Sequence, residues 1–276
     1  MVKILSLFLL LYTFAMAKEV NQEDIVLTQK IKTFIKESVY EQNRAFIDII
    51  FTPSSNFYVK DKVDVVKVAQ TLKDNGLLSL FFKEPQELKL TFKTTGSPQF
   101  FVKIMSDSLR NMGYYKYVTT ESTLSDSEFA WGITLSSEYA TDPVILQKEL
   151  SKSGCKIVDI HKNSVTNWEY VIDISSGSLD IETLKSATEF ELKRALYAHW
   201  LNVSGVKNLK VTSSSSNNWY PYIAYYDASL HLLEVIKKDE KTNSIVLEIP
   251  KLAKYVKISD LYTLKNIKDN LLLLPN

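Results

Sequence analysis

The chain has 276 residues, 45% of them hydrophobic, and its 33 basic and 32 acidic side chains give a formal net charge of +1. Nucleic-acid binding needs a basic surface that displaces counterions, so this balance argues against nucleic acid as a partner. A single cysteine, Cys155, excludes a disulfide within the chain, and the apolar content is that of a globular protein.

The N-terminus has the three parts of a cleavable secretory signal peptide. Lys3 supplies a positive charge, residues 4–15 form a short apolar run, and Ala-Met-Ala at 15–17 is a small-x-small cleavage site. A membrane-spanning helix needs about 20 apolar residues, more than this run contains. We therefore expect a signal peptide at 1–17, a mature N-terminus at Lys18, and a periplasmic protein without a membrane span.

A polar segment with helical rhythm comes next, at 18–44. Its apolar residues are spaced three or four apart, which is typical of a helix that buries one face. We predict an N-terminal helical segment that docks on the rest of the chain or on a partner. The residues of its apolar face are Leu27, Ile31, Phe34 and Ile35.

A unit of one helix followed by two strands then recurs along the chain. Helices are predicted at 97–112 and 142–153, and a weaker copy at 64–75 is followed by predicted strands at 77–82 and 87–95. Each helix opens on Ser or Asp and is followed by glycine, the expected punctuation of a helix. The strands after them alternate apolar and polar residues, which predicts one buried face. Trp131 and Trp168 occupy equivalent positions on that face, so both are expected to be buried.

The order of these elements predicts the fold. With an opening strand at 46–51, and a last helix from about 180 leading to a strand at 207–213, the order is βαββαβ, twice. This is the split βαβ order of ferredoxin-like domains. We predict an α+β protein with two tandem ferredoxin-like modules, at 45–122 and 126–213. The alternative is one larger α+β domain in which the recurrence is coincidental.

The last part of the chain reads as strands. A linker is predicted at 213–218, followed by a small all-β, sandwich-like domain at 217–276. Strand alternation places Tyr220, Tyr222 and Tyr226 on one face of its first strand, and Trp219, Ile223 and Tyr225 on the other. One face belongs to the core, and the other could stack on sugar rings or protein partners. The candidate contact residues are therefore Trp219, Tyr220, Tyr222 and Tyr226, with simple packing as the alternative.

No pattern predicts catalysis, a cofactor or a metal site. The spacings of zinc sites, P-loops, dinucleotide-binding loops, nucleophile elbows and EF-hands do not occur. Cys155 and His161 lie six residues apart on one predicted strand, about 20 Å at ~3.3 Å per residue, too far for proton transfer. Cys155 is better interpreted as a small buried apolar residue. A carboxylate pair drawn from distant segments, as in glycoside hydrolases, stays open.

Three functions follow as hypotheses. The predicted element order resembles modules of periplasmic rings, secretion machines and other envelope assemblies, although a fold does not fix a function. The first hypothesis is a non-catalytic periplasmic scaffold or adaptor of a secretion or motility type of machine, with other envelope proteins as partners. The second is a periplasmic protein that binds peptidoglycan or another glycan on its aromatic strand. A hydrolase is the third.

Overall fold

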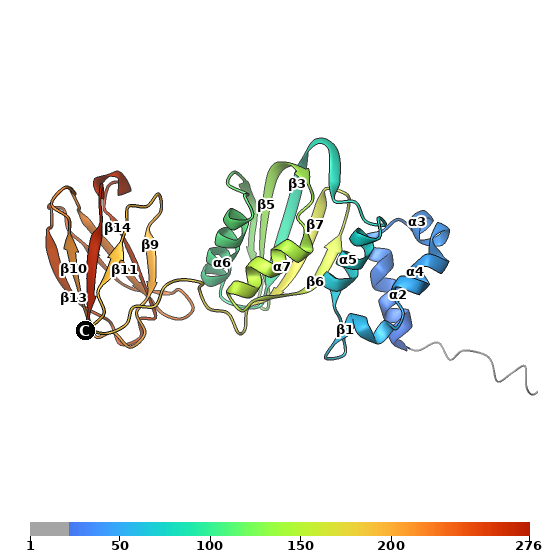
Figure 1. Cartoon of the computed structure of the whole chain (residues 1–276), viewed down its shortest axis with the longest axis horizontal. Coiled ribbons are helices and arrows are strands. Elements are labelled where there is room, and N and C mark those ends of the chain that lie inside the picture. The colour runs from blue at the N-terminus through green and yellow to red at the C-terminus, as the bar shows by residue number, and fades with distance from the viewer. Residues whose placement is uncertain (1–21) are drawn as a thin grey trace, which may run out of the picture.

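The computed structural model describes residues 22–276, so the predicted signal peptide and the mature N-terminus at Lys18 lie outside the described residues. The molecule is elongated, with a group of short helices at one end, a mixed α/β part in the middle and two small sheets at the other end (Figure 1). The predicted α+β class is confirmed.

A five-stranded sheet forms the middle of the molecule. Its strands are β3 (Phe81–Thr94), β4 (Val118–Leu124), β5 (Phe129–Tyr139), β6 (Lys156–Lys162) and β7 (Asn167–Asp173). Their order is β4-β5-β3-β7-β6. The central pair, β3 and β7, is parallel, and the other neighbours are antiparallel. One mixed sheet therefore joins strands from both predicted modules.

Helices α6 (Pro98–Asn111) and α7 (Pro143–Lys152) cover one face of this sheet, with α5 (Val65–Asp74) beside them (Figure 1). Each helix begins after the Ser or Asp and ends before the glycine that the sequence predicts as its boundaries. The carboxylates that cap α5 and α7 come from Asp64, which accepts from an amide at 3.0 Å, and Asp142, which accepts from one at 2.9 Å. The glycines beyond the three helices have positive φ, a backbone conformation that glycine adopts without strain.

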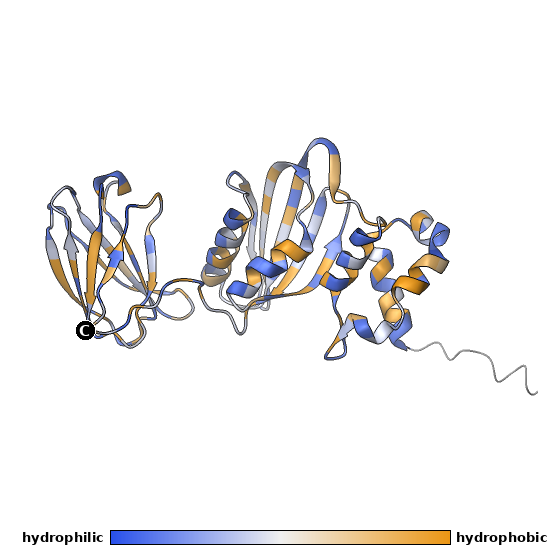
Figure 2. Ribbon diagram, viewed as in Figure 1, coloured by the Kyte–Doolittle hydropathy of each residue, from blue (hydrophilic) through white to orange (hydrophobic). Residues whose placement is uncertain are grey.

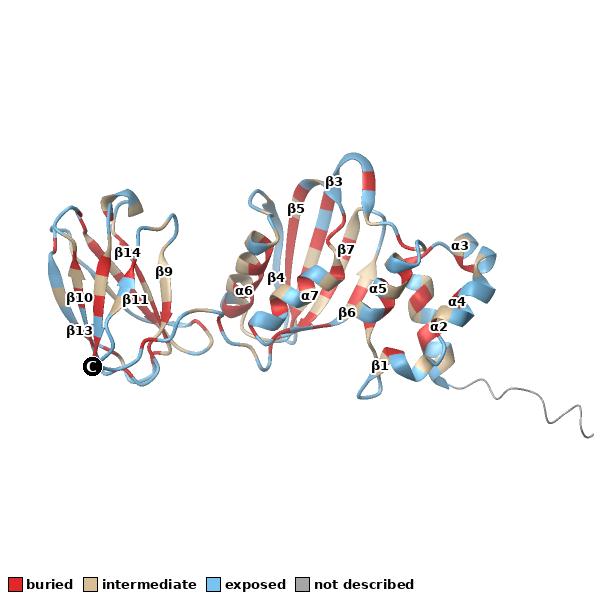
Figure 3. Ribbon diagram, viewed as in Figure 1, coloured by how far each residue is buried: buried red, intermediate tan, exposed pale blue. Residues whose placement is uncertain are grey.

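Alternation along the strands decides which face of the sheet is covered. Leu88, Leu90 and Phe92 of β3 are buried beneath the helices, whereas Lys89 between them is exposed. Buried and exposed stretches alternate along β3 in Figure 3. Bands of hydrophobic and hydrophilic colour alternate along the central strands in Figure 2. Trp131 and Trp168 are 4% and 0% exposed, so their predicted burial is confirmed.

The two tandem ferredoxin-like modules are not what forms. The segments at 77–82 and 87–95, predicted as two strands, contribute to the single strand β3, whose pairing shifts between Phe81 and Gln86. Residues 46–51, predicted as the opening strand, fall mainly in helix α4 (Arg44–Ile50). A short apolar run fits a strand or a helix equally well, which is why its pattern misled the prediction. Strand β7 lies between β3 and β6 and completes one sheet.

The helix predicted from about residue 180 is also wrong. This stretch is mostly irregular and contains β8 (Phe190–Leu192) and the start of β9 (His199–Asn202). Leu184 and Leu192 are buried in the C-terminal core, whereas Leu196, which lies within the predicted helix, is 86% exposed. Burial in the tertiary structure therefore overrides the local helical preference of this segment.

The N-terminal segment is helical, as predicted. It consists of α2 (Gln22–Phe34) and α3 (Glu37–Gln42), followed by α4. The predicted apolar face of α2 is buried against the rest of the chain, and Lys30 of α2 contacts Asp159 of β6. Lys162 of β6 donates a 2.7 Å hydrogen bond to the carbonyl of Phe34. A short 3-10 turn (Ser54–Phe57) and a hairpin of β1 (Tyr58–Val59) and β2 (Lys62–Val63) lead into α5.

Two four-stranded antiparallel sheets form the C-terminal domain, with the orders β13-β10-β15-β8 and β12-β11-β14-β9. They enclose one apolar core, as in a β-sandwich, with Leu209, Trp219, Tyr225 and Val256 among its fully buried residues. The remaining elements are β10 (Asn208–Ser213), β11 (Pro221–Tyr226), β12 (Leu232–Lys237), β13 (Ser244–Glu248), β14 (Tyr255–Asp260), a 3-10 turn (Leu264–Asn266) and β15 (Leu271–Pro275).

The sandwich begins earlier than the predicted boundary at 217, because β8, β9 and β10 are part of it. The predicted linker at 213–218 is instead a tight loop between β10 and β11. Asn217 in this loop is 1% exposed. Its side chain accepts from the amides of Lys268 and Asp269 at 2.8 and 2.9 Å and donates to the carbonyl of Asn270 at 2.8 Å. Because an asparagine that fixes a buried loop cannot be distinguished by sequence from one in an exposed linker, the polar run by itself indicates a linker.

The sandwich packs against the α/β domain through the outer face of the β11 sheet. Tyr255 points out of the sandwich core, yet it is 1% exposed because it joins the core of the α/β domain. Leu230 is buried in the same cluster. Ser97, which precedes α6, donates a 2.7 Å hydrogen bond to the carbonyl of Ser229. The two domains therefore share an apolar contact next to α6.

Candidate binding cleft

Four aromatic residues are predicted from the sequence to contact a ligand or partner, and the structure excludes one of them from that role. Trp219 is 0% exposed, and its indole N–H donates a 2.9 Å hydrogen bond to the carbonyl of Ser259. A fully buried, hydrogen-bonded indole packs in the core and is not available to a ligand. The prediction that Trp219 contacts a ligand or partner is therefore wrong, and Trp219 is a core residue.

The three tyrosines lie on the outside of the sandwich, as the strand alternation predicts. Tyr222 and Tyr226 project from β11 and are half-buried, whereas Ile223 and Tyr225 are 0% exposed on the inner face. Tyr220 precedes β11 and packs edge-on against Tyr262, with ring centroids 5.2 Å apart. The tyrosines therefore do not form one continuous shelf, because Tyr220 is engaged in this separate pair.

Tyr226 opens onto a cleft of about 490 Å³ between the two domains. One wall is the face of α6 that points away from the central sheet, and the other is the outer face of β9, β11 and β14. The volume falls within the range of roughly 300–1,000 Å³ that small-molecule sites usually have. The lining residues are Gln99, Val102, Lys103, Ser106, Asp107, Arg110, Tyr197, Ala198, Trp200, Tyr226, Leu230 and Lys257.

Trp200 is the largest aromatic residue in this cleft, and the other side chains gather around it. Its ring lies 5.0 Å from that of Tyr226, at an angle of 35°. The ammonium of Lys103, from α6, is 5.2 Å from the ring centroid, and that of Lys257, from β14, is 5.9 Å away. Cations at such distances are attracted by the ring quadrupole. The cleft therefore combines an apolar platform with positive charge contributed by both domains.

The cleft carries more positive than negative charge. Three cations, Lys103, Arg110 and Lys257, face one carboxylate, Asp107. Asp107 contacts the ammonium of Lys103 and lies 3.1 Å from the guanidinium of Arg110, so two cations share it. Lys257 makes no ion pair with any residue between 22 and 276. An anion would therefore be attracted to this cleft.

The hydroxyl of Tyr226 stays protonated over the whole physiological range. Burial raises its pKa above the ordinary value of 10.0, and the neighbouring Tyr222 adds to this shift. A neutral phenol can both donate and accept a hydrogen bond. Tyr226 therefore adds a polar, uncharged group beside the platform.

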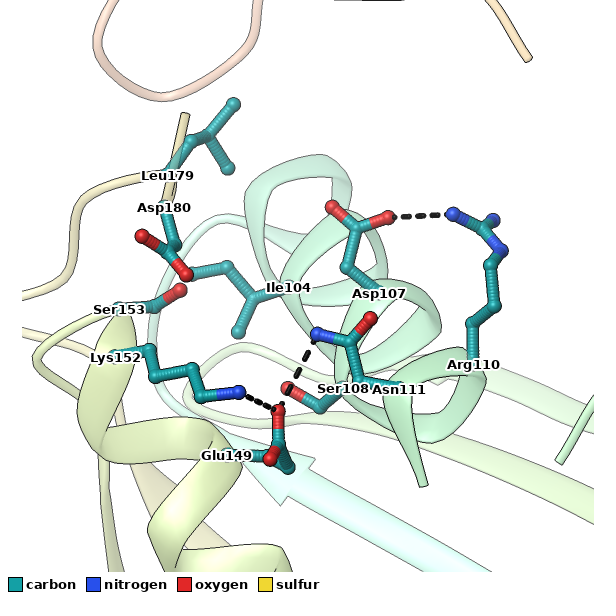
Figure 4. A pocket seen from close by; sticks show the side chains of 10 residues that line it. All are labelled: Ile104, Asp107, Ser108, Arg110, Asn111, Glu149, Lys152, Ser153, Leu179 and Asp180. Atoms are coloured by element: carbon teal, nitrogen blue, oxygen red, sulfur yellow. Dashed lines mark hydrogen bonds and ion pairs between the residues drawn. The ribbon is translucent and has the colours of Figure 1, made fainter. Parts of the chain in front are cut away.

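A second, smaller pocket of about 150 Å³ lies between α6, α7 and the segment at Leu179 and Asp180 (Figure 4). Three of its polar groups, on Asn111, Glu149 and Lys152, bind each other. Glu149 accepts from Lys152 at 2.6 Å and from Asn111 at 3.3 Å, and the hydrogen bond from Lys152 is the main reason why the pKa of Glu149 is lowered. Because these charges are already paired, we favour the larger cleft as the binding site.

Cys155 and His161, the pair considered as nucleophile and base, both lie outside this cleft. Cys155 is 0% exposed, and burial raises its pKa to about 11, so its thiol is protonated and unreactive at neutral pH. His161 lies 3.3 Å from Asp159 on the open face of the sheet. In the described part of the chain, no three His, Cys, Asp or Glu side chains gather where they could hold a metal ion.

Sequence reasoning missed Trp200, Lys103 and Lys257. Trp200 followed a segment interpreted as a helix, so its outward position on β9 could not be foreseen. Lys103 is on the polar side of a correctly predicted helix, where a lysine ordinarily faces solvent. Lys257 follows the alternation of β14, which indicates an outward side chain without indicating what covers it.

Comparisons with known proteins do not assign the chain to a family. No protein family model matches the chain, and a search of curated proteins finds no match. In residues 22–276, no helix is both long enough and apolar enough to cross a membrane.

Proposed function

We propose that the protein is a non-catalytic scaffold or adaptor of a bacterial envelope assembly, and that it binds a partner protein at the open edge of its central sheet. The observation that carries this proposal is strand β4. All seven of its residues are exposed. Among residues 22–276 it pairs with one strand, β5, and it forms the edge of the sheet.

An exposed edge strand presents unpaired backbone groups that can pair with a strand from another protein. Proteins commonly protect such edges with lysine, proline, a β-bulge or a covering loop. The sequence of β4, VTTESTL, has none of these side chains and a single charge, at Glu121. A shift in pairing between Thr119 and Glu121 interrupts the strand at one point, and residues 121–124 then pair with β5 without a further shift. The edge is therefore suited to strand addition.

Exposed aromatic side chains near the same sheet support an interaction role. Phe81 and Tyr139 are 56% and 53% exposed, and their rings contact each other at 5.2 Å. They border a groove of about 590 Å³ whose other apolar lining residues include Leu78, Met112 and Ile145. Large exposed apolar groups that lie together are typical of protein-contact surfaces.

Site-specific crosslinking in living cells tests the adaptor proposal. Thr120, which is exposed and outside the paired register of β4, is replaced by a photo-crosslinking residue such as p-benzoylphenylalanine. We expect a discrete crosslinked partner that is lost when Val118→Lys is added, because lysine on an edge strand opposes strand addition.

Val246→Lys is the matched control, since Val246 is 69% exposed on the sandwich edge strand β13 and Val118 is 67% exposed on β4. The control should keep the crosslink. No crosslink from Thr120, or one that Val118→Lys leaves intact, would argue against strand addition at β4.

Export is part of the proposal and has its own test. The Ala-Met-Ala motif at 15–17 supports cleavage before Lys18. Intact-mass measurement of the protein from a periplasmic fraction should give a chain that begins at Lys18. Recovery in the cytoplasm with residues 1–17 retained would contradict the proposed location.

Glycan binding is a second candidate function, favoured by the Trp200–Tyr226 pair in the cleft. The C–H groups of a sugar ring form an apolar face that packs well on an aromatic ring. Co-sedimentation with purified peptidoglycan tests this candidate. The wild-type protein should pellet, and Trp200→Leu should not, whereas Tyr262→Leu, which alters an aromatic residue outside the cleft, should behave as the wild type.

A further inference from the structure

We infer that the interdomain cleft binds an acidic saccharide, a sugar that carries a carboxylate, and that the ligand contacts both domains at once. This inference rests on the glycan-binding candidate and specifies the class of sugar. It comes from the chemistry of the two cleft walls rather than from the aromatic residues alone.

The aromatic wall belongs to the sandwich. Trp200 on β9 and Tyr226 on β11 lie on either side of β14, and both are half-buried, so parts of their rings remain accessible. A pyranose ring is apolar on its face and polar on its rim. The platform therefore suits a sugar ring, and the neutral hydroxyl of Tyr226 can reach its polar rim.

The charged wall belongs mostly to α6. Gln99, Lys103, Ser106 and Arg110 recur at helical spacing along the side of α6 that faces the sandwich, and all four line the cleft. Gln99 and Ser106 offer uncharged hydrogen-bonding groups of the kind that sugar hydroxyls use. Lys103 offers an ammonium group, and its side chain is 20% exposed. The wall thus supplies both hydroxyl and carboxylate partners.

The excess of positive charge indicates that the sugar is acidic. Lys103 and Arg110 share the carboxylate of Asp107, and Lys257 has no acidic partner among the described residues. A ligand carboxylate near Trp200 would be close to both Lys103 from one domain and Lys257 from the other. Charge-assisted hydrogen bonds of this kind are stronger than neutral ones. A neutral sugar would leave this charge uncompensated.

Carboxylated sugars reach an envelope protein from two sources, the muramic acid of peptidoglycan strands whose stem peptide has been removed and the uronic acids of other polysaccharides. The test therefore uses three probes with the purified protein: the disaccharide N-acetylglucosaminyl-N-acetylmuramic acid, tri-galacturonic acid, and neutral chitobiose. Binding is measured by calorimetry and by tryptophan fluorescence. Trp131, Trp168 and Trp219 are buried, so a change in emission reports mainly on Trp200.

We expect at least one acidic probe to bind about tenfold or more tightly than chitobiose, with an affinity that falls as salt is added. The double variant Lys103→Met, Lys257→Met should lose this preference. Lys210→Met, which removes an exposed lysine on β10 of the opposite sheet, should keep it. Near-ultraviolet circular dichroism checks that each variant is folded. The tighter of the two acidic probes identifies the source.

The outcomes separate this inference from the functions on which it rests. Equal binding of acidic and neutral probes would overturn the acidic-sugar inference and leave glycan binding standing. A preference that survives the double variant would also overturn it. If no probe binds, both the inference and the glycan candidate fail, whereas the adaptor proposal depends only on β4 and its crosslink.

Discussion

The backbone N–H of Leu179, in the segment between the two domains, donates a 3.3 Å hydrogen bond to the phenolic oxygen of Tyr255 on β14. Both residues are buried, although Tyr255 points away from the core of its own domain. Removing the acceptor leaves a buried amide unpaired. Tyr255→Phe should therefore lower the stability of the interdomain contact by about 1–3 kcal/mol. Limited proteolysis of residues 174–189 measures this effect, and cleavage at the wild-type rate would contradict it. Tyr197→Phe, at a position 55% exposed, is the control.

At Tyr225, the same Tyr→Phe substitution is expected to raise the stability of the protein rather than lower it. Its hydroxyl is buried in the sandwich and has no hydrogen-bond partner among the described residues, and burial raises its pKa well above the ordinary value. A buried unpaired hydroxyl costs free energy, so Tyr225→Phe should stabilise the sandwich by about 1 kcal/mol. Thermal denaturation decides this. A lower midpoint would mean that the hydroxyl has a partner, such as a bound water molecule.

Trp131 and Trp168 belong to one aromatic group under the helices. Phe92 lies 6.0 Å from Trp131, and Tyr170 lies 6.4 Å from Trp168, with Phe92 and Tyr170 stacked at 5.7 Å between them. Truncating either tryptophan to Ala should cost about 3–5 kcal/mol, the usual range for a buried large aromatic residue. Urea denaturation followed by circular dichroism measures the loss. A loss below about 1 kcal/mol for both variants would be inconsistent with the burial seen here.

Cys155 gives a prediction about pH. Burial raises the pKa of its thiol from 9.0 to about 11 in the folded state, so the fold favours the protonated form. The resulting stability is fully present below pH 9 and is lost as the pH rises towards 11. At pH 8 the thiolate fraction in the folded protein is about a hundredfold lower than in the unfolded chain, so iodoacetamide should label Cys155 mainly after unfolding. The stability of Cys155→Ala should fall less between pH 9 and 11. Rapid labelling of the native protein would refute the buried placement.

The sequence predicts the helices of the central domain well because their ends are marked by local chemistry. Asp64 and Asp142 cap α5 and α7 as their positions suggest, and glycines with positive φ follow each helix. The strands β5 and β7 follow equally from their alternation. Such features depend on neighbours in sequence, which is what a single sequence contains.

The pairing of strands depends on distant residues and was not predicted. The parallel contact of Leu90 with Trp168 joins β3 to β7 across the supposed boundary between modules. Nothing in either strand alone indicates this choice. The same limit applies to the cleft. Lys103 and Trp200 meet because the sandwich packs beside α6, and the burial of Tyr255 that fixes this packing is not visible in the alternation of β14.

The position of β7 has a consequence for the order in which the chain folds. This strand is the last of the central sheet in sequence, yet it lies between β3 and β6 and alone connects them. A chain that ends before Asn167 would leave one side of β3 open and β6 without a neighbour in the sheet. Contacts between residues so far apart in sequence form slowly. When the chain is synthesised from its N-terminus, this domain therefore stays incomplete until nearly two thirds of the chain is available. The incomplete domain would need protection from aggregation during that time.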